Sequence, residues 1–258
     1  MLNLDKVLSV KKLIRFIYTI SLLCSCHTLS ATTFIIGTEN IEYYPHYGIS
    51  SPSSIEFEGF ARAFFDDFSA KNDISISYSP QPITRLYFSL LIDESIDLKY
   101  PDSPDWNVRK KAKINKRIYY SQPISSYIDG VFVRKGNNTK LKNISHLGIV
   151  SGFTPEPFMD AIVSKKIKLL EFTKSDSLFK ALQRKLVDAI YINVDVAKYQ
   201  MVKNGITDIE FNENLPYTKG YYYISSINHP NIIKLIDNYI KENQTYISTL
   251  KHKLKLSH

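Results

Sequence analysis

Two polar residues directly follow an apolar run in the second half of the chain. The run is Ala189-Ile-Tyr-Ile192, which has the short apolar character of a buried strand, and Asn193 and Asp195 come just after it. In an open α/β sheet, ligands bind at the carboxyl ends of the strands, where such polar groups can reach them. We therefore predict that Asn193 and Asp195 bind a ligand.

A turn further upstream has the composition of an anion-binding site. Ser151-Gly-Phe-Thr154 follows a strand signal at Leu147–Val150, and Thr154 and Pro155 suit the N-cap and the first position of a helix. A strand end, a glycine turn and a helix N-terminus in succession favour anion binding. An ordinary capped helix explains the same residues equally well. Ser151 and Thr154 are the candidate ligand contacts in this turn.

Aromatic residues add a third group of candidates. Tyr43 and Tyr44 lie in a polar, aromatic loop, and Trp106 lies in a turn-rich segment, 99–117, whose length is typical of functional loops. Aromatic rings offer broad apolar contact at low entropic cost, which suits amino acids, sugars and aromatic solutes alike. The aromatic candidates therefore predict a binding site without selecting its ligand.

Hydrophobic spacing locates the elements that must position these residues. Strands are predicted where apolar residues run or alternate, and helices where they recur every three or four positions. Segment 85–102 weakly repeats the order of elements in 177–199, which suggests two similar α/β lobes. The predicted strands are 33–37, 74–78, 130–133, 147–150, 189–192 and 220–225, and the predicted helices carry Phe57, Phe60, Phe64, Phe65 and Phe68, then Leu86 and Leu90 behind a Thr84 N-cap, then Leu178, Leu182 and Leu186, then Ile232 to Ile240 behind Pro230.

The N-terminal segment, 1–31, is typical of a secretory signal. A basic stretch precedes the apolar residues 16–24, which are too few to span a membrane, and Leu29-Ser-Ala31 fits a cleavage site. A lipid anchor on Cys26 is the alternative. Removal of residues 1–31, with four Lys or Arg and one Asp, would lower the formal net charge from +8 to +5. Periplasmic export is the expectation, and nucleic acid is not an expected partner.

Enzyme and cofactor signatures are absent from the sequence. It has no Gly-x-Gly pair, no Walker loop, no Gly-x-Ser-x-Gly elbow and no His-x-x-x-His pair, and its six histidines are scattered. Both cysteines lie before the predicted cleavage site, so the mature chain would have no thiolate for catalysis or metal binding. We expect no cofactor, no metal and no catalytic residue. The basic residues 109–117 and the tail from Lys251 to His258 are expected to be solvated.

Five short motifs occur in the order found in one known family. Each is weak alone, but together they resemble the bacterial periplasmic solute-binding proteins of the type II, amino-acid-binding (family 3-like) class, over residues 33 to 245. The matching motifs are Ile36-Gly-Thr-Glu39 with Tyr44-Pro45, Phe57-Glu-Gly-Phe60, Tyr120-Ser-Gln-Pro123 followed by Gly130 to Gly136, Val150-Ser-Gly-Phe-Thr154, and Leu182 to Tyr199.

The resemblance implies a two-lobed α/β fold with two hinge strands. The first lobe would comprise 32–131 and 222–258, and the second lobe 132–221. A small polar solute, amino-acid-like or related, would bind in the cleft between the lobes, which would close around it. The protein would be a monomer that delivers its solute to an ABC permease or a membrane sensor.

Two departures from the family leave the ligand open. Ile114 and Asn115 stand where the resemblance implies an arginine for the ligand carboxylate, and Asn193 stands where it implies an aspartate for the ammonium group. One alternative is a dehydratase-like enzyme on the same scaffold. Another is a secreted protein that has lost its ligand. Candidate acid–base groups for the enzyme are Glu39, Glu42, Asp102 and Asp195.

Overall fold

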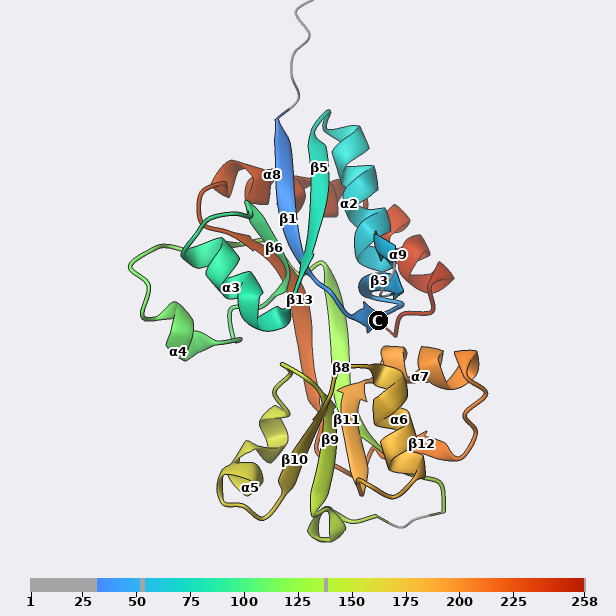
Figure 1. The fold of residues 1–258 in the computed structure, drawn as a ribbon. Coiled ribbons are helices and arrows are strands. Elements are labelled where there is room, and N and C mark those ends of the chain that lie inside the picture. The colour runs from blue at the N-terminus through green and yellow to red at the C-terminus, as the bar shows by residue number, and fades with distance from the viewer. Residues whose placement is uncertain (1–31, 52–53, 137–138, 258) are drawn as a thin grey trace, which may run out of the picture. The chain divides into compact units, whose positions relative to one another are not determined.

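A ten-stranded mixed sheet forms the centre of the computed structural model, which describes residues 32–51, 54–136 and 139–257 (Figure 1). The predicted signal segment and the Cys26 anchor fall outside these residues. Eight strands form one continuous row, β12 (Ile209–Phe211) pairs with β8, and β7 (Tyr119–Tyr120) pairs with β13. The row runs β10 (Lys168–Phe172), β9 (His146–Val150), β11 (Ala189–Asn193), β8 (Ser125–Arg134), β13 (Thr218–Ser226), β6 (Leu98–Asp102), β1 (Thr33–Glu39) and β5 (Ser75–Gln81).

Two parallel groups of strands are joined by an antiparallel pair. β1 runs parallel to β5 and β6, and β9 runs parallel to β10 and β11. Between these groups, β8 pairs with β13 over Ser125–Asp129 and with β11 over Asp129–Phe132, while β13 continues onto β6 at Tyr223 and Ser225. The chain therefore has a two-lobed α/β fold in which β8 and β13 are the two hinge strands, as the sequence predicts.

Helices flank the ten-stranded sheet in both lobes (Figure 1). A separate three-stranded sheet lies beside the first lobe. It comprises β2 (Glu42–Tyr43), β3 (Tyr47–Ser51) and β4 (Ser54–Glu58). The helices are α2 (Phe60–Lys71), α3 (Ile83–Leu91), α4 (Val108–Lys111), α5 (Met159–Val163), α6 (Ser175–Gln183), α7 (Val194–Lys203), α8 (Pro230–Glu242) and α9 (Gln244–Lys253), with 3-10 turns at Leu141–Asn143 and Glu156–Phe158.

The predicted phenylalanine series packs into the core of the first lobe. All five side chains are buried, and four of them project from α2. The Phe65 ring lies edge-on to Phe64 and to Tyr100, with both centroid distances at 5.1 Å. Edge-to-face contacts of this kind add to the hydrophobic free energy of burial. The predicted burial of all five is therefore confirmed, but Phe57 lies on β4 and not on the helix, because α2 begins at Phe60 after Gly59.

Two predicted helix ends are wrong. α6 ends at Gln183, so Leu186 lies beyond it and is 60% exposed, whereas Leu178 and Leu182 are buried. Lys185 has a left-handed backbone, φ 61°, which turns the chain before the periodic pattern is complete. At α3 the N-cap position belongs to Pro82, and Thr84 lies inside the first turn.

The C-terminal tail is not wholly solvated, contrary to the prediction. α9 extends through Lys253, Leu256 is buried at 9% exposure, and the backbone N–H of Ser257 donates to the Asp195 carboxylate at 3.0 Å. The charges of the tail favour solvation, but one leucine and one serine near its end make the contacts. No helix in the described part of the chain is long and apolar enough to cross a membrane.

Truncation of Phe64 tests the aromatic core. The fully buried ring contacts Phe65 and Tyr239 edge-on, so Phe64→Ala should lower the free energy of unfolding by about 3–5 kcal/mol in urea denaturation. Phe88→Ala on α3 is the control, because that ring is 47% exposed, and it should cost about 1 kcal/mol or less. Equal losses in the two variants would contradict this assignment of the core.

Candidate functional site

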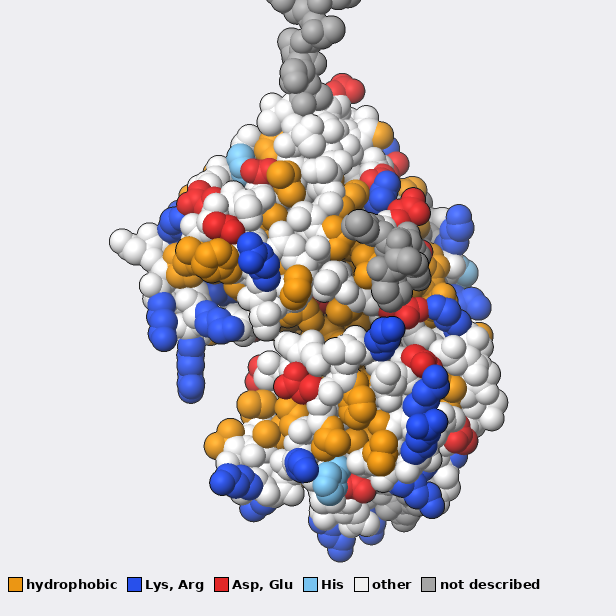
Figure 2. Space-filling model, in the orientation of Figure 1, with side chains coloured by type: hydrophobic (Ala, Val, Ile, Leu, Met, Phe, Trp, Pro, Cys, Tyr) orange, Lys and Arg blue, Asp and Glu red, His pale blue; other side chains and the backbone are white. Residues whose placement is uncertain are grey.

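A cleft of about 690 Å³ lies between the two lobes. Residues 39–47, 83–87 and 99–110 line one wall, residues 152–163 line the other, and strands β8, β11 and β13 lie between them. Its volume suits a small solute. Figure 2 shows the hollow, with Lys and Arg side chains on one side of its mouth and acidic side chains on the other. A second depression of about 720 Å³, lined by 139–141 and 212–217, contains none of the predicted site residues.

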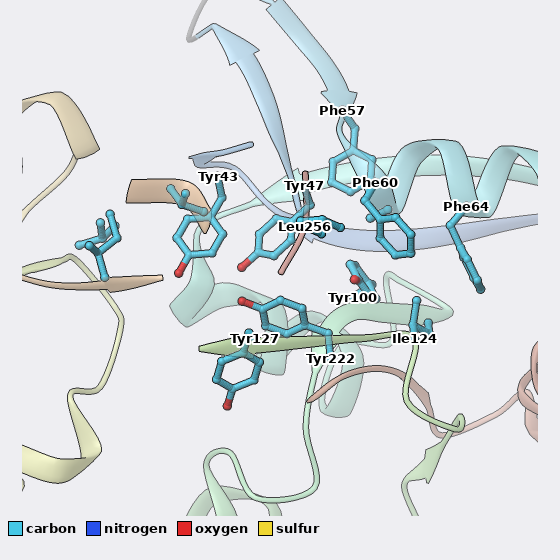
Figure 3. Close-up of a cluster of buried hydrophobic side chains, with 14 of the residues drawn as sticks. Tyr43, Tyr47, Phe57, Phe60, Phe64, Tyr100, Ile124, Tyr127, Tyr222 and Leu256 are labelled. Atoms are coloured by element: carbon cyan, nitrogen blue, oxygen red, sulfur yellow. The ribbon is translucent and has the colours of Figure 1, made fainter. Parts of the chain in front are cut away.

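Six tyrosines, one phenylalanine and the single tryptophan line the cleft, and four of the tyrosines cluster near the tryptophan. The Tyr127 and Tyr222 rings stack with their centroids 4.7 Å apart, and the ring centroids of Tyr43 and Tyr47 are 5.1 Å apart. Trp106 Nε1 donates a hydrogen bond to the Tyr127 hydroxyl at 3.2 Å. The hydroxyl groups of Tyr43, Tyr47 and Tyr222 point the same way, away from the phenylalanine core (Figure 3). The cluster therefore has an apolar side toward the core and a polar side toward the cleft.

Strand register explains why Tyr127 lies flat over the sheet. Cross-strand partners share a face, and β13 places Gly220 opposite Tyr127. A β-carbon on Gly220 would lie 2.6 Å from the Tyr127 ring carbon that carries the hydroxyl, so only glycine leaves room for the ring at this point. The absence of a side chain lets Tyr127 fold across β13 and stack on Tyr222.

Glu39, at the end of β1, is a buried acid in the cleft wall. It is 2% exposed, and its Oε2 accepts a hydrogen bond from the Tyr47 hydroxyl at 2.7 Å. Burial raises the pKa of Glu39 to about 7, although the Lys99 charge and the Tyr47 hydrogen bond act in the opposite direction. Glu39 is therefore close to the point of changing charge at neutral pH.

Asp129 is the second acid of the cleft and lies on β8. Its Cα partners are Thr218 on β13 and Asn193 on β11, so it occupies the residue where β8 passes from one neighbour to the other. Its Oδ1 is buried without a hydrogen-bond partner, as is the Nδ2 of Asn193 opposite. Burial raises the pKa of Asp129 to about 7, the nearby Asn193 amide offsets part of this rise, and the Glu39 charge adds to it.

The one lysine buried in the cleft wall is already engaged. Among the described residues, Lys99 is 1% exposed, its Nζ donates to the Pro101 carbonyl, and it lies 3.6 Å from Asp102 Oδ1. Burial would raise the pKa of Asp102, but Lys99 and Lys111 outweigh it and hold the pKa below its usual value. Asp102 also accepts hydrogen bonds from Tyr87 and Ser225. This network fixes the base of the 99–117 segment.

Three of the seven predicted ligand-binding residues line the cleft. They are Tyr43, Trp106 and Thr154, whereas Tyr44, Ser151, Asn193 and Asp195 are outside its lining. The sequence-based set omits the residues that give the cleft its chemistry. The main omissions are Lys99, Tyr127, Asp129 and Tyr222, and Glu39 entered only as a candidate acid.

Three of the residues outside the lining have structural contacts. Asn193 is the N-cap of α7, and its side-chain oxygen accepts from the backbone N–H groups of Asp195 and Val196 at 2.9 and 3.1 Å. The Tyr44 ring packs 4.5 Å from that of Tyr199 on α7. The Ser151 N–H donates to the Phe172 carbonyl. None of these contacts directs the side chain into the cleft.

The predicted helix after Thr154 is also different from expectation. Residues 156–158 form a 3-10 turn, α5 has five residues and begins at Met159, and no side-chain cap bond forms at either start. Thr154 is therefore not an N-cap. Gly152 has a left-handed backbone, φ 91°, which an added side chain would strain. The turn positions Phe153 and Thr154 without presenting a helix N-terminus.

Asp195 joins three segments of the chain away from the cleft. Its carboxylate accepts hydrogen bonds from Ser257 at the C-terminus and lies 3.3 Å from Nε2 of His46, whose side chain is fully buried. Burial would raise the pKa of Asp195, but His46 and Ser257 outweigh it and hold the pKa below its usual value. We refer to Asp195, His46 and Ser257 as the α7 clasp.

The described residues of the cleft offer binding groups and one of the four candidate acid–base residues. Of the four candidate acid–base residues, only Glu39 lines the cleft. Glu42 pairs with Lys203, Asp102 pairs with Lys99 and Lys111, and Asp195 belongs to the α7 clasp. Among the described residues, no group of three His, Cys, Asp or Glu side chains could hold a metal ion. What remains is an aromatic cleft with the buried acid Glu39 and the half-buried acid Asp129.

No protein-family model matches the chain, and no curated protein sequence matches it. Solved structures are similar to the chain in fold. An ancestral arginine-binding protein bound to arginine superposes with a TM-score of 0.69 at 19% identity, covering 86% of this chain and 97% of that one. An arginine transport system periplasmic binding protein from Legionella pneumophila gives 0.68 at 15% identity, covering 87% and 100%.

An ancestral amino-acid-binding protein, a precursor of cyclohexadienyl dehydratase, gives a TM-score of 0.67 at 17% identity, covering 86% of this chain and 95% of that one. At these identities the similarity establishes the fold. The chain has the two-lobed type II fold of periplasmic amino-acid-binding proteins.

Removal of the Asp195 charge tests the α7 clasp. Asp195→Asn should lower the free energy of unfolding at pH 7 by about 1–3 kcal/mol, because His46 and Ser257 lose a charged acceptor. The folded-state pKa is lowered, so the stabilisation is present above the ordinary carboxyl value of 3.8 and is lost as the pH falls below it. Urea denaturation at pH 7 and at pH 3 measures both effects.

The control is Asp176→Asn on α6, which removes an exposed ion pair with Lys180. It should change stability by about 0.5 kcal/mol or less at either pH. A difference between Asp195→Asn and the parent that is as large at low pH as at neutral pH would contradict the charge-based account of the clasp.

Proposed function

We propose that the protein captures a small solute in the inter-lobe cleft and delivers it to an ABC transporter or a membrane sensor. The observation that carries the proposal is the position of the cleft. Its walls belong to opposite ends of the sheet, and β8 and β13 run between them. A solute held there touches both lobes and therefore favours the closed arrangement over the open one.

The lobes in this proposal are 32–131 with 222–258, and 132–221. Charges at the mouth support closure, since Arg109 and Lys110 line one wall and Glu156 and Asp160 line the other. Opposite charges on facing walls attract as the lobes approach. Export through the N-terminal signal, release or anchoring in the periplasm, and a monomeric state are parts of the same proposal.

An enzyme on this scaffold is the second candidate. Two acids of the cleft, Glu39 and Asp129, have pKa values of about 7 and are suited to proton transfer at neutral pH, and one structural neighbour is the precursor of a dehydratase. The two candidates differ in the fate of the solute. Mass spectrometry of the recovered ligand after prolonged incubation should show it unchanged for a binding protein, and chemically altered for an enzyme.

Solute binding should be visible through Trp106, the only tryptophan of the chain, because it lines the cleft. We expect one class in a panel of amino acids, amines, sugars and organic acids to change its fluorescence and to raise the melting temperature. At 100 times the dissociation constant, a ligand adds about 2.7 kcal/mol of stability.

A matched pair of variants ties that signal to the cleft. Thr154 is exposed and lines the cleft, so Thr154→Phe should block binding without disturbing a buried group. Thr173→Phe places the same ring at an exposed position outside the lining and should bind like the parent. If no solute class alters either the fluorescence or the melting temperature, the proposed function is wrong.

A further inference from the structure

Asp129, on the floor of the cleft, has no cation within ion-pair distance among the described residues. Lys99 is engaged by Asp102, and Arg109 and Lys110 lie on the exposed helix α4 at the mouth. Asp129 makes no ion pair with any Lys, Arg or His of the described residues, and its Oδ1 has no hydrogen-bond partner. A buried carboxylate oxygen without a partner is unfavourable, so this position favours a ligand that brings positive charge.

The side chains around Asp129 are those that accept an organic cation. Alternation along β8 puts Tyr127 on the same face as Asp129, and the register with β13 brings Tyr222 and Thr218 to that face. Aromatic faces attract ammonium groups through their quadrupoles, and a carboxylate beside them adds a full negative charge. The groups that face Asp129 from the surrounding elements are Glu39 on β1, Tyr43 on β2, Tyr127 on β8, Tyr191 on β11 and Tyr222 on β13.

We propose that the solute is an organic ammonium compound and that Asp129, among Tyr43, Tyr127 and Tyr222, is the partner of its ammonium group. This inference rests on the proposed solute-binding function. It moves the ammonium site from the end of β11, where the sequence predicts it, to the hinge strand β8. Asn193, directly opposite Asp129, is already used as the N-cap of α7.

The proposed site gives both Glu39 and Asp129 a role in binding. It does not need the arginine that the family resemblance implies for a ligand carboxylate. Glu39 contributes a second negative charge behind Tyr47, to which it is hydrogen-bonded. A ligand with both an ammonium and a carboxylate group would extend from Asp129 toward Arg109 at the mouth, whereas a simple amine needs only the inner site. The ammonium group is the common requirement, and the test separates the two kinds of ligand.

Titration of the purified chain with matched compounds tests the proposal. Phenethylamine, phenylalanine and phenylpropionate share a phenyl ring and differ only in their charged groups, and butylamine and butyrate form an aliphatic pair. Calorimetry and Trp106 fluorescence should detect phenethylamine and give no binding for phenylpropionate or butyrate. Binding of phenylalanine at equal or greater strength would assign the carboxylate to the cations at the mouth, and weaker binding would assign the cleft to amines.

Asp129→Asn should weaken amine binding by about tenfold or more, because the ammonium group loses its charged partner. Asp105→Asn is the control, since that acid also lines the cleft but is exposed, and it should change the affinity by about threefold or less. Asp129→Asn should remain folded at pH 8 with a melting temperature no lower than the parent's, because the ionised form of a carboxyl with a raised pKa is unfavourable in the folded state.

The pH dependence of amine binding is an independent test of the assignment of Asp129. Both Glu39 and Asp129 have pKa values of about 7, so they acquire negative charge between pH 6 and pH 8. The affinity for phenethylamine, which stays protonated over this range, should rise across it. An affinity that is flat or falls would overturn the assignment of Asp129.

The outcomes separate this inference from the function on which it rests. Binding of phenylpropionate or a sugar, with no binding of any amine, overturns the ammonium site and leaves the solute-binding function standing. Equal affinities of the parent and Asp129→Asn for an amine also overturn the site. If no compound of the wider panel changes the fluorescence or the melting temperature, both proposals fail together.

Discussion

The exchange of partners along β8 is the constraint on which the rest of the structure depends. One end of this strand pairs with β13 and the other with β11, and Asp129 is the residue that belongs to both pairings. The same backbone hydrogen bonds that join the lobes therefore hold the acid of the cleft in place. A change in the angle between the lobes must alter the surroundings of this carboxylate, which links hinge and site through a single residue.

Three carboxylates in and beside the cleft are accommodated in three different ways. Asp102 is compensated by two lysines and two hydroxyl groups, and Glu39 by one tyrosine hydroxyl and the more distant Lys99 charge. Asp129 has only a neighbouring amide and a ring of tyrosines. Natural sequences violate the rule of paired buried charge mainly where function requires it. Asp102 is thus fully compensated within a structural network, whereas Asp129 is the carboxylate that the protein leaves for a ligand.

Much of the fold can be predicted from the sequence because it depends on local periodicity. The phenylalanine series on α2 and the run that forms β11 are examples, and the order of the elements is enough to indicate two lobes with two hinge strands. Leu186 shows the limit, because a left-handed residue ended α6 where the pattern continued. Periodicity reports the preferred face of a helix, while the end of a helix is set by single backbone conformations.

The cleft was less predictable, since strand register determines which side chains share a face. Asn193 and Asp195 stand at a strand end, but Asn193 caps α7 and Asp195 holds His46 and Ser257. Asp129 had one local signal, an acid within the otherwise apolar strand around Gly130-Val-Phe-Val133. Its importance emerges only when β11 and β13 bring their residues to the same face, which proximity along the chain does not reveal.

Contacts of α7 complete this picture of the hinge. The α7 clasp, the ion pair of Lys203 with Glu42, and the packing of Tyr199 on Tyr44 all attach α7 to the β2–β3 segment of the first lobe. α4 and α5 lie on the other side of β8 and β13 (Figure 1), and no ion pair of the described residues joins them. Separation of the lobes on the α7 side would break several contacts, whereas the side with α4 and α5 can widen or narrow without such losses. In the proposed solute-binding role, the attached side would restrict relative motion of the lobes to rotation about the hinge strands, and this rotation would open and close the cleft around Asp129.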